Sequence, residues 1–231
     1  MTRTLRWVGY LAIAAARSRP KGAIMNSYAW KVVVRGLGWG TLGCLILSGC
    51  SATVQLRYNP MPVVSKFPNK KVAVVQFADG VPKDKQVGRA KNLYGMTIRW
   101  ITLKPPVVAA LSETITDALN RSGMDAELVQ AAQAPDGAFV VTGQLKDMML
   151  KSHPGWSEVK MESMILFDVQ VKRPDGRVVA LGPFEGRVEP TSVGGAALNL
   201  DQSFEEAMKG AIEDGVRKLF AKLKSDSVFG N

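Results

Sequence analysis

Hydrophobic residues recur with two different spacings along the chain, and the spacing separates strands from helices. Alternation is clearest over residues 157–172, where Val159, Ile165 and Phe167 share one face and charged residues lie mainly on the other. Residues 71–77 form a continuous valine-rich run between turn residues, which predicts a strand buried on both faces. Three further strands are predicted from shorter patterns, over residues 126–129, 138–150 and 178–188.

Two segments repeat their apolar residues at helical spacing. The first helix is predicted to start at Pro105-Pro106 and to end near Gly123, and the second covers residues 201–224. The pattern predicts an α+β fold in the order β-α-β-β-β-β-α. We expect a mixed, mostly antiparallel sheet with both amphipathic helices on one face, and a parallel crossover in the first β-α-β.

An apolar run of about 11 residues near the N-terminus ends in Leu47-Ser48-Gly49-Cys50. This ending resembles a bacterial lipobox, the signal at which a cysteine receives a diacylglyceryl group and the chain is cut just before it. Residues 1–49 are then a lipoprotein signal peptide. Its true start is expected at Met25, because the residues from Met25 to Gly49 have the usual length of a signal (about 15–30 residues) and residues 1–49 exceed it. The first alternative to a lipobox is a membrane-spanning anchor, but the apolar run is shorter than the ~20 residues that a membrane span needs. The second alternative is an ordinary cleavable signal.

Lipidation of Cys50 implies a partner and a location. Two or three acyl chains anchor a protein stably, so the membrane is the first expected partner. Ser51 stands where an aspartate would resemble an inner-membrane retention signal, so we expect the outer membrane and a domain facing the periplasm. The mature chain would hold no free thiol, because Cys44, the only other cysteine, leaves with the signal.

The positive charge of the chain is concentrated in the expected signal. The net charge is +10, and residues 1–49 hold seven basic residues and no acidic one, which leaves +3 for residues 50–231. That small excess does not favour nucleic acid as a partner. Residues 50–69 contain Pro60, Pro62 and Pro68 and are predicted to be an extended tether, although residues 54–58 could equally be an edge strand. The single domain is expected over residues 70–226.

The order of these features resembles the YajG-type family of small outer-membrane lipoproteins. The resemblance rests on the lipobox, the strand at 72–79, the helix ending in Ser122-Gly123, the VVTGQL run at 140–145 and the Asp175-Gly176 turn. It is a resemblance of pattern, and it implies a fold and a location but no activity. More loosely, the chain resembles activators of peptidoglycan synthases and auxiliary lipoproteins of transporters.

The sequence offers little for catalysis, a metal or a cofactor, and none is predicted. His153 is the only histidine, and it lies in a turn between two predicted strands. Neither a Gly-x-Ser-x-Gly elbow nor a metal-ligand spacing accompanies it. A solvated loop histidine is therefore the preferred interpretation, and a hydrolase is the least supported function.

The long segment over residues 80–104 is the better candidate for a contact surface, because it mixes basic and aromatic residues that suit an anionic partner. We predict binding by this segment and the turn at 153–156, through Arg89, Lys91, Tyr94, Arg99, Trp100, His153 and Trp156. The alternative is a solvated loop in which Ile98 and Trp100 pack as an extra strand. The expected function is a non-enzymatic binding or adaptor domain for an envelope protein or an anionic envelope polymer. An auxiliary subunit of an envelope transporter, or an activator of a cell-wall synthase, is the second hypothesis.

Overall fold

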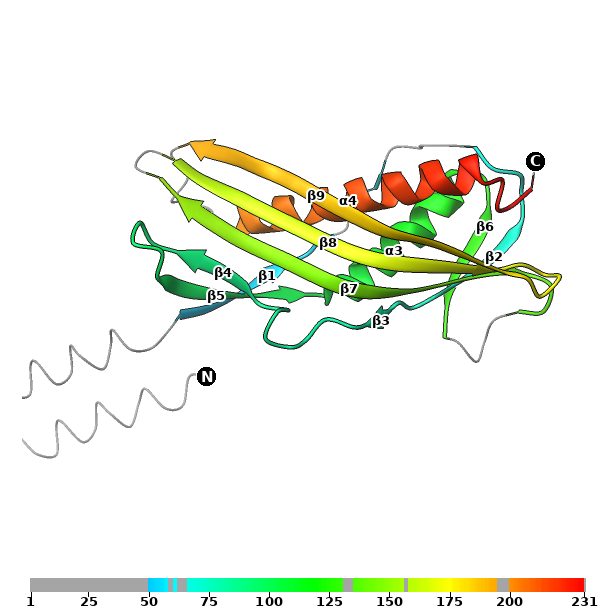
Figure 1. Ribbon diagram of the computed structural model, residues 1–231, viewed down its shortest axis with the longest axis horizontal. Coiled ribbons are helices and arrows are strands. Elements are labelled where there is room, and N and C mark those ends of the chain that lie inside the picture. The colour runs from blue at the N-terminus through cyan, green and yellow to red at the C-terminus, as the bar shows by residue number, and fades with distance from the viewer. Residues whose placement is uncertain are drawn as a thin grey trace, which may run out of the picture. The chain divides into compact units, whose positions relative to one another are not determined.

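The computed structural model describes residues 50–57, 60–61, 66–130, 135–155, 158–194 and 200–230 (Figure 1). The expected signal peptide therefore lies outside the described residues. In chain order, the elements are β1 (Cys50–Gln55), β2 (Lys71–Val75), β3 (Ala78–Asp79), β4 (Gly88–Lys91), β5 (Thr97–Lys104), α3 (Val107–Arg121), β6 (Asp125–Val129), β7 (Phe139–Pro154), β8 (Glu158–Lys172), β9 (Val178–Gly194) and α4 (Leu200–Ser225).

The long strand β7 is the centre of one mixed sheet. On one side it pairs with β8, which pairs in turn with β9, and both pairings are antiparallel. On its other side β7 pairs in succession with β2, β3 and β4, all parallel to it. Strand β6 lies outside β2, while β5 and then β1 lie outside β4. The sheet therefore has one continuous half and one half built of two separate groups of strands.

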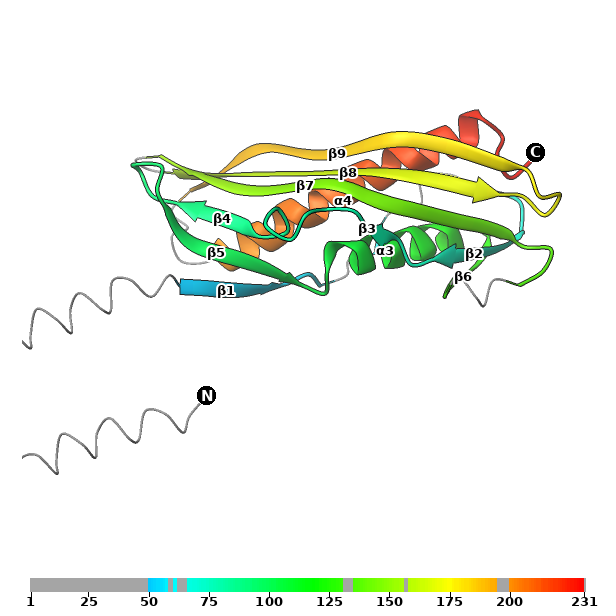
Figure 2. The same ribbon diagram turned by 60° about the horizontal axis from the view of Figure 1, so that its bottom comes forward.

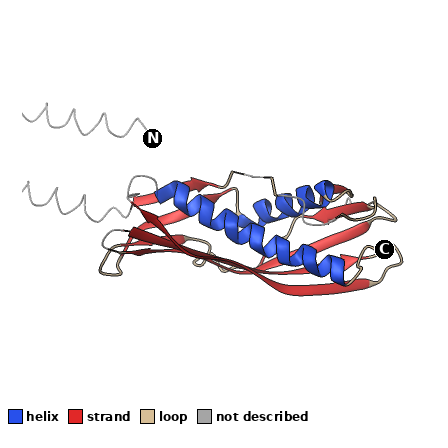
Figure 3. Cartoon of the chain, turned by 90° about the horizontal axis from the view of Figure 1, so that it is seen from above, coloured by secondary structure: helices blue, strands red, loops and turns tan. Residues whose placement is uncertain are grey.

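Both described helices lie on the same face of this sheet, as Figures 2 and 3 show. The α+β fold predicted from the sequence is confirmed, and β2 and β6, which flank α3 in the chain, are parallel as expected. The apolar stripe of α4 faces the sheet, and Phe204, Met208 and Phe220 are fully buried there. In β8, alternate residues from Met161 to Val171 are buried, which is the predicted face.

The prediction of an extended tether over residues 50–69 is wrong for the described part of that segment. Its first six residues form β1, which pairs parallel to β5 at the edge of the sheet, so an edge strand does occur, but it begins earlier than the alternative over residues 54–58 and shares only Val54 and Gln55 with it. Leu56 and Met61 are buried in the core, and the Phe67 ring lies 5.9 Å from the Phe220 ring. Apolar side chains before and between the prolines therefore hold the described parts of this segment against the domain.

The domain boundaries and the element order change in the same way. The domain starts before residue 70 and continues past residue 226, because Val228 and Phe229 are buried and the Phe229 ring packs edge-on against Phe139. The predicted order began at residue 71 and left out β5, which was only an alternative for residues 80–104, and the short strands β3 and β4. Strands β3 and β4 are too short to show a period of their own, and they exist because β7 offers them a free edge for hydrogen bonding.

Candidate functional site

The candidate basic and aromatic segment folds mainly as a β-hairpin of β4 and β5. Its loop is closed by Asn92, whose Oδ1 accepts hydrogen bonds from the backbone N–H groups of Tyr94 and Met96, both at 3.0 Å. Gly95 has a φ of +78°, a conformation that the loop needs and that glycine adopts at no steric cost. The hairpin is therefore an ordered element, and the expected extra strand does form as β5.

The hairpin carries most of the exposed large hydrophobic side chains among the described residues. Five of the seven large hydrophobic side chains that are exposed there lie on it: Leu93, Tyr94, Met96, Ile98 and Trp100. Tyr94 is 86% exposed and Trp100 is 41% exposed. Ile98 and Trp100 belong to the extra strand of the alternative interpretation, and both lie on its exposed face. Sequence reasoning had not singled out Leu93 and Met96.

The basic residues of the hairpin have different surroundings. The Arg89 guanidinium stacks over the Trp100 ring at 5.1 Å, directly across the strand pair. Arg99 forms an ion pair with Asp201 at the start of α4, with 3.0 Å between Nη1 and Oδ1, so its charge is engaged within the domain. Lys91 is half-buried, and its backbone N–H donates to Ser152 Oγ at 3.1 Å.

His153 lies near this hairpin, at the end of β7. Its Nε2 is 3.0 Å from Glu162 Oε2, and the other oxygen of Glu162 accepts from Arg187 Nη2 at 3.0 Å. Both oxygens of the carboxylate are thus occupied, in an exposed cross-strand cluster. This arrangement fits a surface contact that orders β7, β8 and β9 against one another.

The structure brings most of the predicted contact residues to one end of the sheet. Arg89 pairs with Lys151, next to Ser152 and His153, and Cys50 pairs with Arg99. Figure 1 shows the β4–β5 loop, the start of β1 and the end of β7 at the same end. Trp156 lies outside the described residues. We call this region, defined by Cys50, residues 88–100 and His153, the anchor end.

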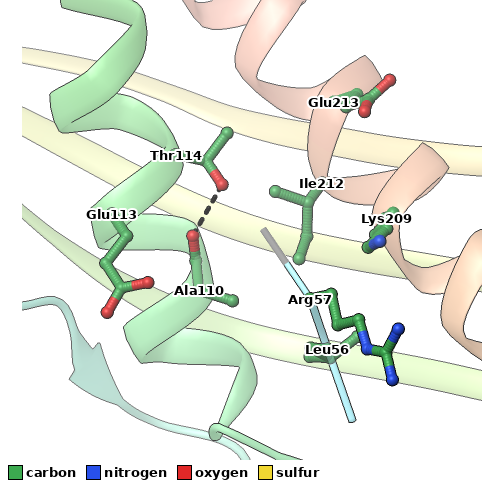
Figure 4. Close-up of a pocket in the computed structure, with 8 residues that line it drawn as sticks. All are labelled: Leu56, Arg57, Ala110, Glu113, Thr114, Lys209, Ile212 and Glu213. Atoms are coloured by element: carbon green, nitrogen blue, oxygen red, sulfur yellow. Dashed lines mark hydrogen bonds between the residues drawn. The ribbon is translucent and has the colours of Figure 1, made fainter. Parts of the chain in front are cut away.

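A small hollow lies elsewhere, between α3, α4 and the segment after β1 (Figure 4). It measures about 30 Å³, which is room for little more than a water molecule. Lys209 on its wall pairs with Glu205 at 2.9 Å, and the Arg57 backbone N–H donates to the same carboxylate at 3.0 Å. Burial alone would raise the pKa of Glu205, but these two partners outweigh it and hold the pKa below its usual value.

A larger hollow of about 520 Å³ lies where β5 ends and α3 begins. Its wall is mainly apolar, with Leu103, Val108 and Met148 among its residues, and Asp79 and Gln86 stand at its polar side. These two polar side chains bond each other at 2.9 Å. Sequence reasoning missed this hollow, because it is assembled from residues that the chain separates widely.

Two searches of the described residues bear on other kinds of site. No helix among them is both long and apolar enough to cross a membrane. No group of three or more histidine, cysteine, aspartate or glutamate side chains in that part of the chain is placed to hold a metal ion.

Comparisons with known proteins reach only distant likenesses. No protein-family model and no curated protein matches the chain. A protein of a family of unknown function from Xanthomonas campestris is 14% identical with a TM-score of 0.44, over 77% of this chain and 98% of that one. An uncharacterized lipoprotein B from Nitrosomonas europaea is 13% identical with a TM-score of 0.36, over 75% and 94%.

A neuraminyllactose-binding hemagglutinin homolog from Helicobacter pylori is 10% identical with a TM-score of 0.35, over 74% of this chain and 92% of that one. At these identities and TM-scores, the likenesses carry no argument about function. The resemblance to the YajG-type family stays a prediction, and any functional proposal depends on the residues of this chain.

Proposed function

We propose that this chain is a bacterial envelope lipoprotein, anchored through a lipid on Cys50 in the outer membrane and facing the periplasm, that acts by binding and not by catalysis. The observation that carries the proposal is the lipobox-like Leu47-Ser48-Gly49-Cys50, together with the start of the folded domain at the same cysteine. A cut just before Cys50 would leave the whole of β1 in the mature protein.

The place of Cys50 in the fold supports this reading. A signal peptide has to be removed without damage to the domain, and the first described element, β1, begins at Cys50 itself. The side of the strand pair β1–β5 that faces the helices carries Ala52, Val54 and Ile101, all buried. The strand that follows the lipidation site is thus an integral part of the core, and the lipid would attach directly to the domain.

The anchor end supports a binding role. It presents apolar and basic side chains outward on an ordered hairpin, and exposed apolar groups of this kind are typical of contact surfaces. His153, the only histidine, shares Glu162 with Arg187 in an exposed cluster, which suits a structural contact better than proton transfer. The contact surface that we propose is therefore the anchor end itself.

The anchor is tested by labelling cells with radioactive palmitate. The wild-type chain should incorporate the label and the Cys50→Ala variant should not, because only the thiol can form the thioether. Cys44→Ala is the matched control, since Cys44 lies in the same apolar run but six residues before the expected site. Equal labelling of the wild type and Cys50→Ala would refute the anchor.

The contact surface is tested by crosslinking in living cells. A photoreactive residue at position 100 should crosslink to an envelope component, while the same residue at position 178 should not. Val178 is a suitable control because it is also an exposed apolar residue. It starts β9 and pairs with Lys172, at the end of β8 far from the hairpin. Equal crosslinking from the two positions, or none from position 100, would count against the anchor end as the contact surface.

A further inference from the structure

We infer that the β4–β5 hairpin is a membrane-docking element, whose apolar tip enters an anionic lipid surface beside the lipid on Cys50. The inference names the partner of the anchor end and rests on the proposed function for the lipid itself.

Position is the first argument. Cys50 pairs with Arg99 and Ser51 with Trp100, in parallel register. Neighbouring strands lie ~4.8 Å apart, so the backbone that would carry the lipid touches the hairpin. From Arg99 back to Tyr94 the chain can extend by at most ~17 Å, at ~3.3 Å per residue. The hairpin therefore runs on past the first residue of β1, and its tip lies within ~20 Å of the lipidated position.

The expected lipidation site lies directly on the sheet. Because β1 begins at Cys50 itself, no described residue lies between the lipidation site and the sheet. A lipid attached there holds the adjacent part of the domain at the membrane surface. The surface patch nearest to Cys50 must then be compatible with lipid.

The tip of the hairpin presents apolar side chains to solvent. Leu93, Tyr94 and Met96 are each more than half exposed, and the hydrogen bonds of Asn92 hold the loop that presents them. Tyr94, together with Trp100 behind it, supplies the amphipathic rings that are enriched at membrane interfaces. A convex apolar tip needs a surface that can yield around it, as lipid does, whereas a protein partner would have to offer a matching hollow.

Basic residues lie at the base of the exposed tip. Arg89 and Lys91 lie on β4, just before the tip in the chain, and Lys151 of β7 pairs with Arg89. Arg89 keeps an exposed position over Trp100. Basic residues next to an inserted apolar element are attracted to anionic headgroups. Arg89 and Trp100 lie level with each other across the strand pair, behind the apolar tip, so a tip buried in lipid would place this ring and this guanidinium at the headgroups.

The test places a nitroxide spin label at the tip of the mature lipoprotein. With Cys44 removed and the Cys50 thiol blocked by lipid, Tyr94→Cys supplies the single free thiol, and Leu93→Cys gives a second reading. Val178→Cys is the control, because Val178 is an exposed valine at the start of β9, where it pairs with the far end of β8. Each protein is reconstituted in vesicles of phosphatidylethanolamine and phosphatidylglycerol, and collisions with membrane-soluble oxygen are compared with those of a water-soluble nickel chelate.

We expect the ratio of oxygen to nickel collisions to be several-fold higher at positions 93 and 94 than at position 178. In the unlipidated Cys50→Ser chain, replacing Leu93, Tyr94 and Met96 together by serine should weaken vesicle binding by about tenfold or more, since complete burial of one such side chain is already worth about a factor of ten. Equal, water-like ratios at all positions would overturn the inference. So would protection at position 94 that appears only when envelope proteins are added, because the partner would then be a protein.

The anchor and the hairpin can fail separately. Mass spectrometry of the purified protein shows whether Cys50 carries lipid, and its absence would refute the proposed function. In that case the spin-label measurement is repeated with the same vesicles on the Cys50→Ser chain, in which Cys44→Ser keeps the labelled position the single free thiol. A buried tip in that chain would support the hairpin on its own, and a water-exposed tip would overturn it.

Discussion

Gly186 of β9 and Gly215 of α4 lie in direct backbone contact. A Cβ placed on Gly186 would stand 2.7 Å from the Gly215 nitrogen and would collide with the Ala211 carbonyl oxygen. A Cβ on Gly215 would in turn stand 2.7 Å from the Phe167 ring. The missing side chains let the helix approach the sheet closely, over a buried aromatic pair in which the Phe167 ring lies 5.7 Å from the Phe184 ring.

Substituting Gly186 by alanine should therefore destabilise the fold strongly. The new methyl group meets backbone, which cannot rotate away, so we expect a loss of about 3 kcal/mol in the free energy of unfolding. Gly137→Ala is the control, because a Cβ there meets nothing within 4 Å and only the φ of +76° is unfavourable. That variant should lose about 1 kcal/mol. Urea denaturation followed by circular dichroism measures both, and equal losses would contradict the close contact.

A buried serine links the first helix to the central sheet. Ser112 Oγ accepts the backbone N–H of Phe77 at 2.9 Å and donates to the Val108 carbonyl at 2.8 Å. Ser112→Ala leaves the Phe77 N–H buried without this partner, at a cost of about 2 kcal/mol.

Thr114→Val provides the comparison for that serine. The Thr114 hydroxyl only donates to the Ala110 carbonyl, at 2.7 Å, and no buried donor loses its acceptor when it is removed. The loss of stability should stay below about 1 kcal/mol. Thermal unfolding of both variants distinguishes them, and the account fails if Thr114→Val is the more damaging change.

The ion pair between Arg99 and Asp201 joins β5 to the start of α4. Both side chains are partly exposed, so we expect a coupling of only about 0.5 kcal/mol. A double-mutant cycle with Arg99→Gln and Asp201→Asn measures it from urea denaturation. The coupling should shrink at about 1 M salt, because the Debye length is then ~3 Å. A coupling that salt leaves unchanged would mean that the pair does not act through its charges.

Asp214 should make stability depend on pH. Burial alone would raise the pKa of Asp214, but hydrogen bonds from Lys218 and from the Arg187 backbone N–H outweigh it and lower the pKa below 3.8. Because the folded-state pKa is the lower one, the stabilisation is complete well above pH ~4 and is lost as pH falls through the folded-state value.

Asp214→Asn tests that dependence. The wild type should exceed the variant by about 0.5–1 kcal/mol at about pH 6, as measured by urea denaturation. The difference should narrow steadily as the pH is lowered below ~4. Glu213→Gln is the neighbouring control, because it removes a carboxylate of the same helix and leaves the Lys218 and Arg187 contacts of Asp214 in place. A difference that grew on acidification would have the wrong sign for this explanation.

Most of the long elements were predictable from the sequence, because each carries its own periodic pattern. The alternation in β8 predicted its buried face from Met161 to Val171. Gly182 and Pro183, residue types that favour a bulge, lie where β9 has one extra residue against Phe167 and Val169. A glycine inside a helix, such as Gly215, either weakens the helix or allows a close approach, and the sequence does not distinguish the two. Only the packing of β9 against α4 chose the second.

The short elements and the candidate site were less predictable. Strand β4 has four residues, which are too few to show a period. In the sequence, no turn residue separates β1 from the proline-containing segment that follows it. Basic and aromatic residues did identify the hairpin as a candidate, and the structure shows it as an ordered, outward-facing element. The larger hollow beside α3 has no local signal at all.

What the sequence alone determined is local: which segments become strands or helices, which of their faces are apolar, and that Cys50 ends a lipobox-like run. These features depend on neighbours a few residues apart, through backbone geometry and the burial of one face. The tertiary structure decided what lies beside Cys50. The parallel pairing of β1 with β5 joins residues that the chain holds far apart, and it brings the expected lipid site next to Trp100 and the exposed hairpin. Such a pairing arises from edges left open by the whole sheet, so no local pattern could have predicted it.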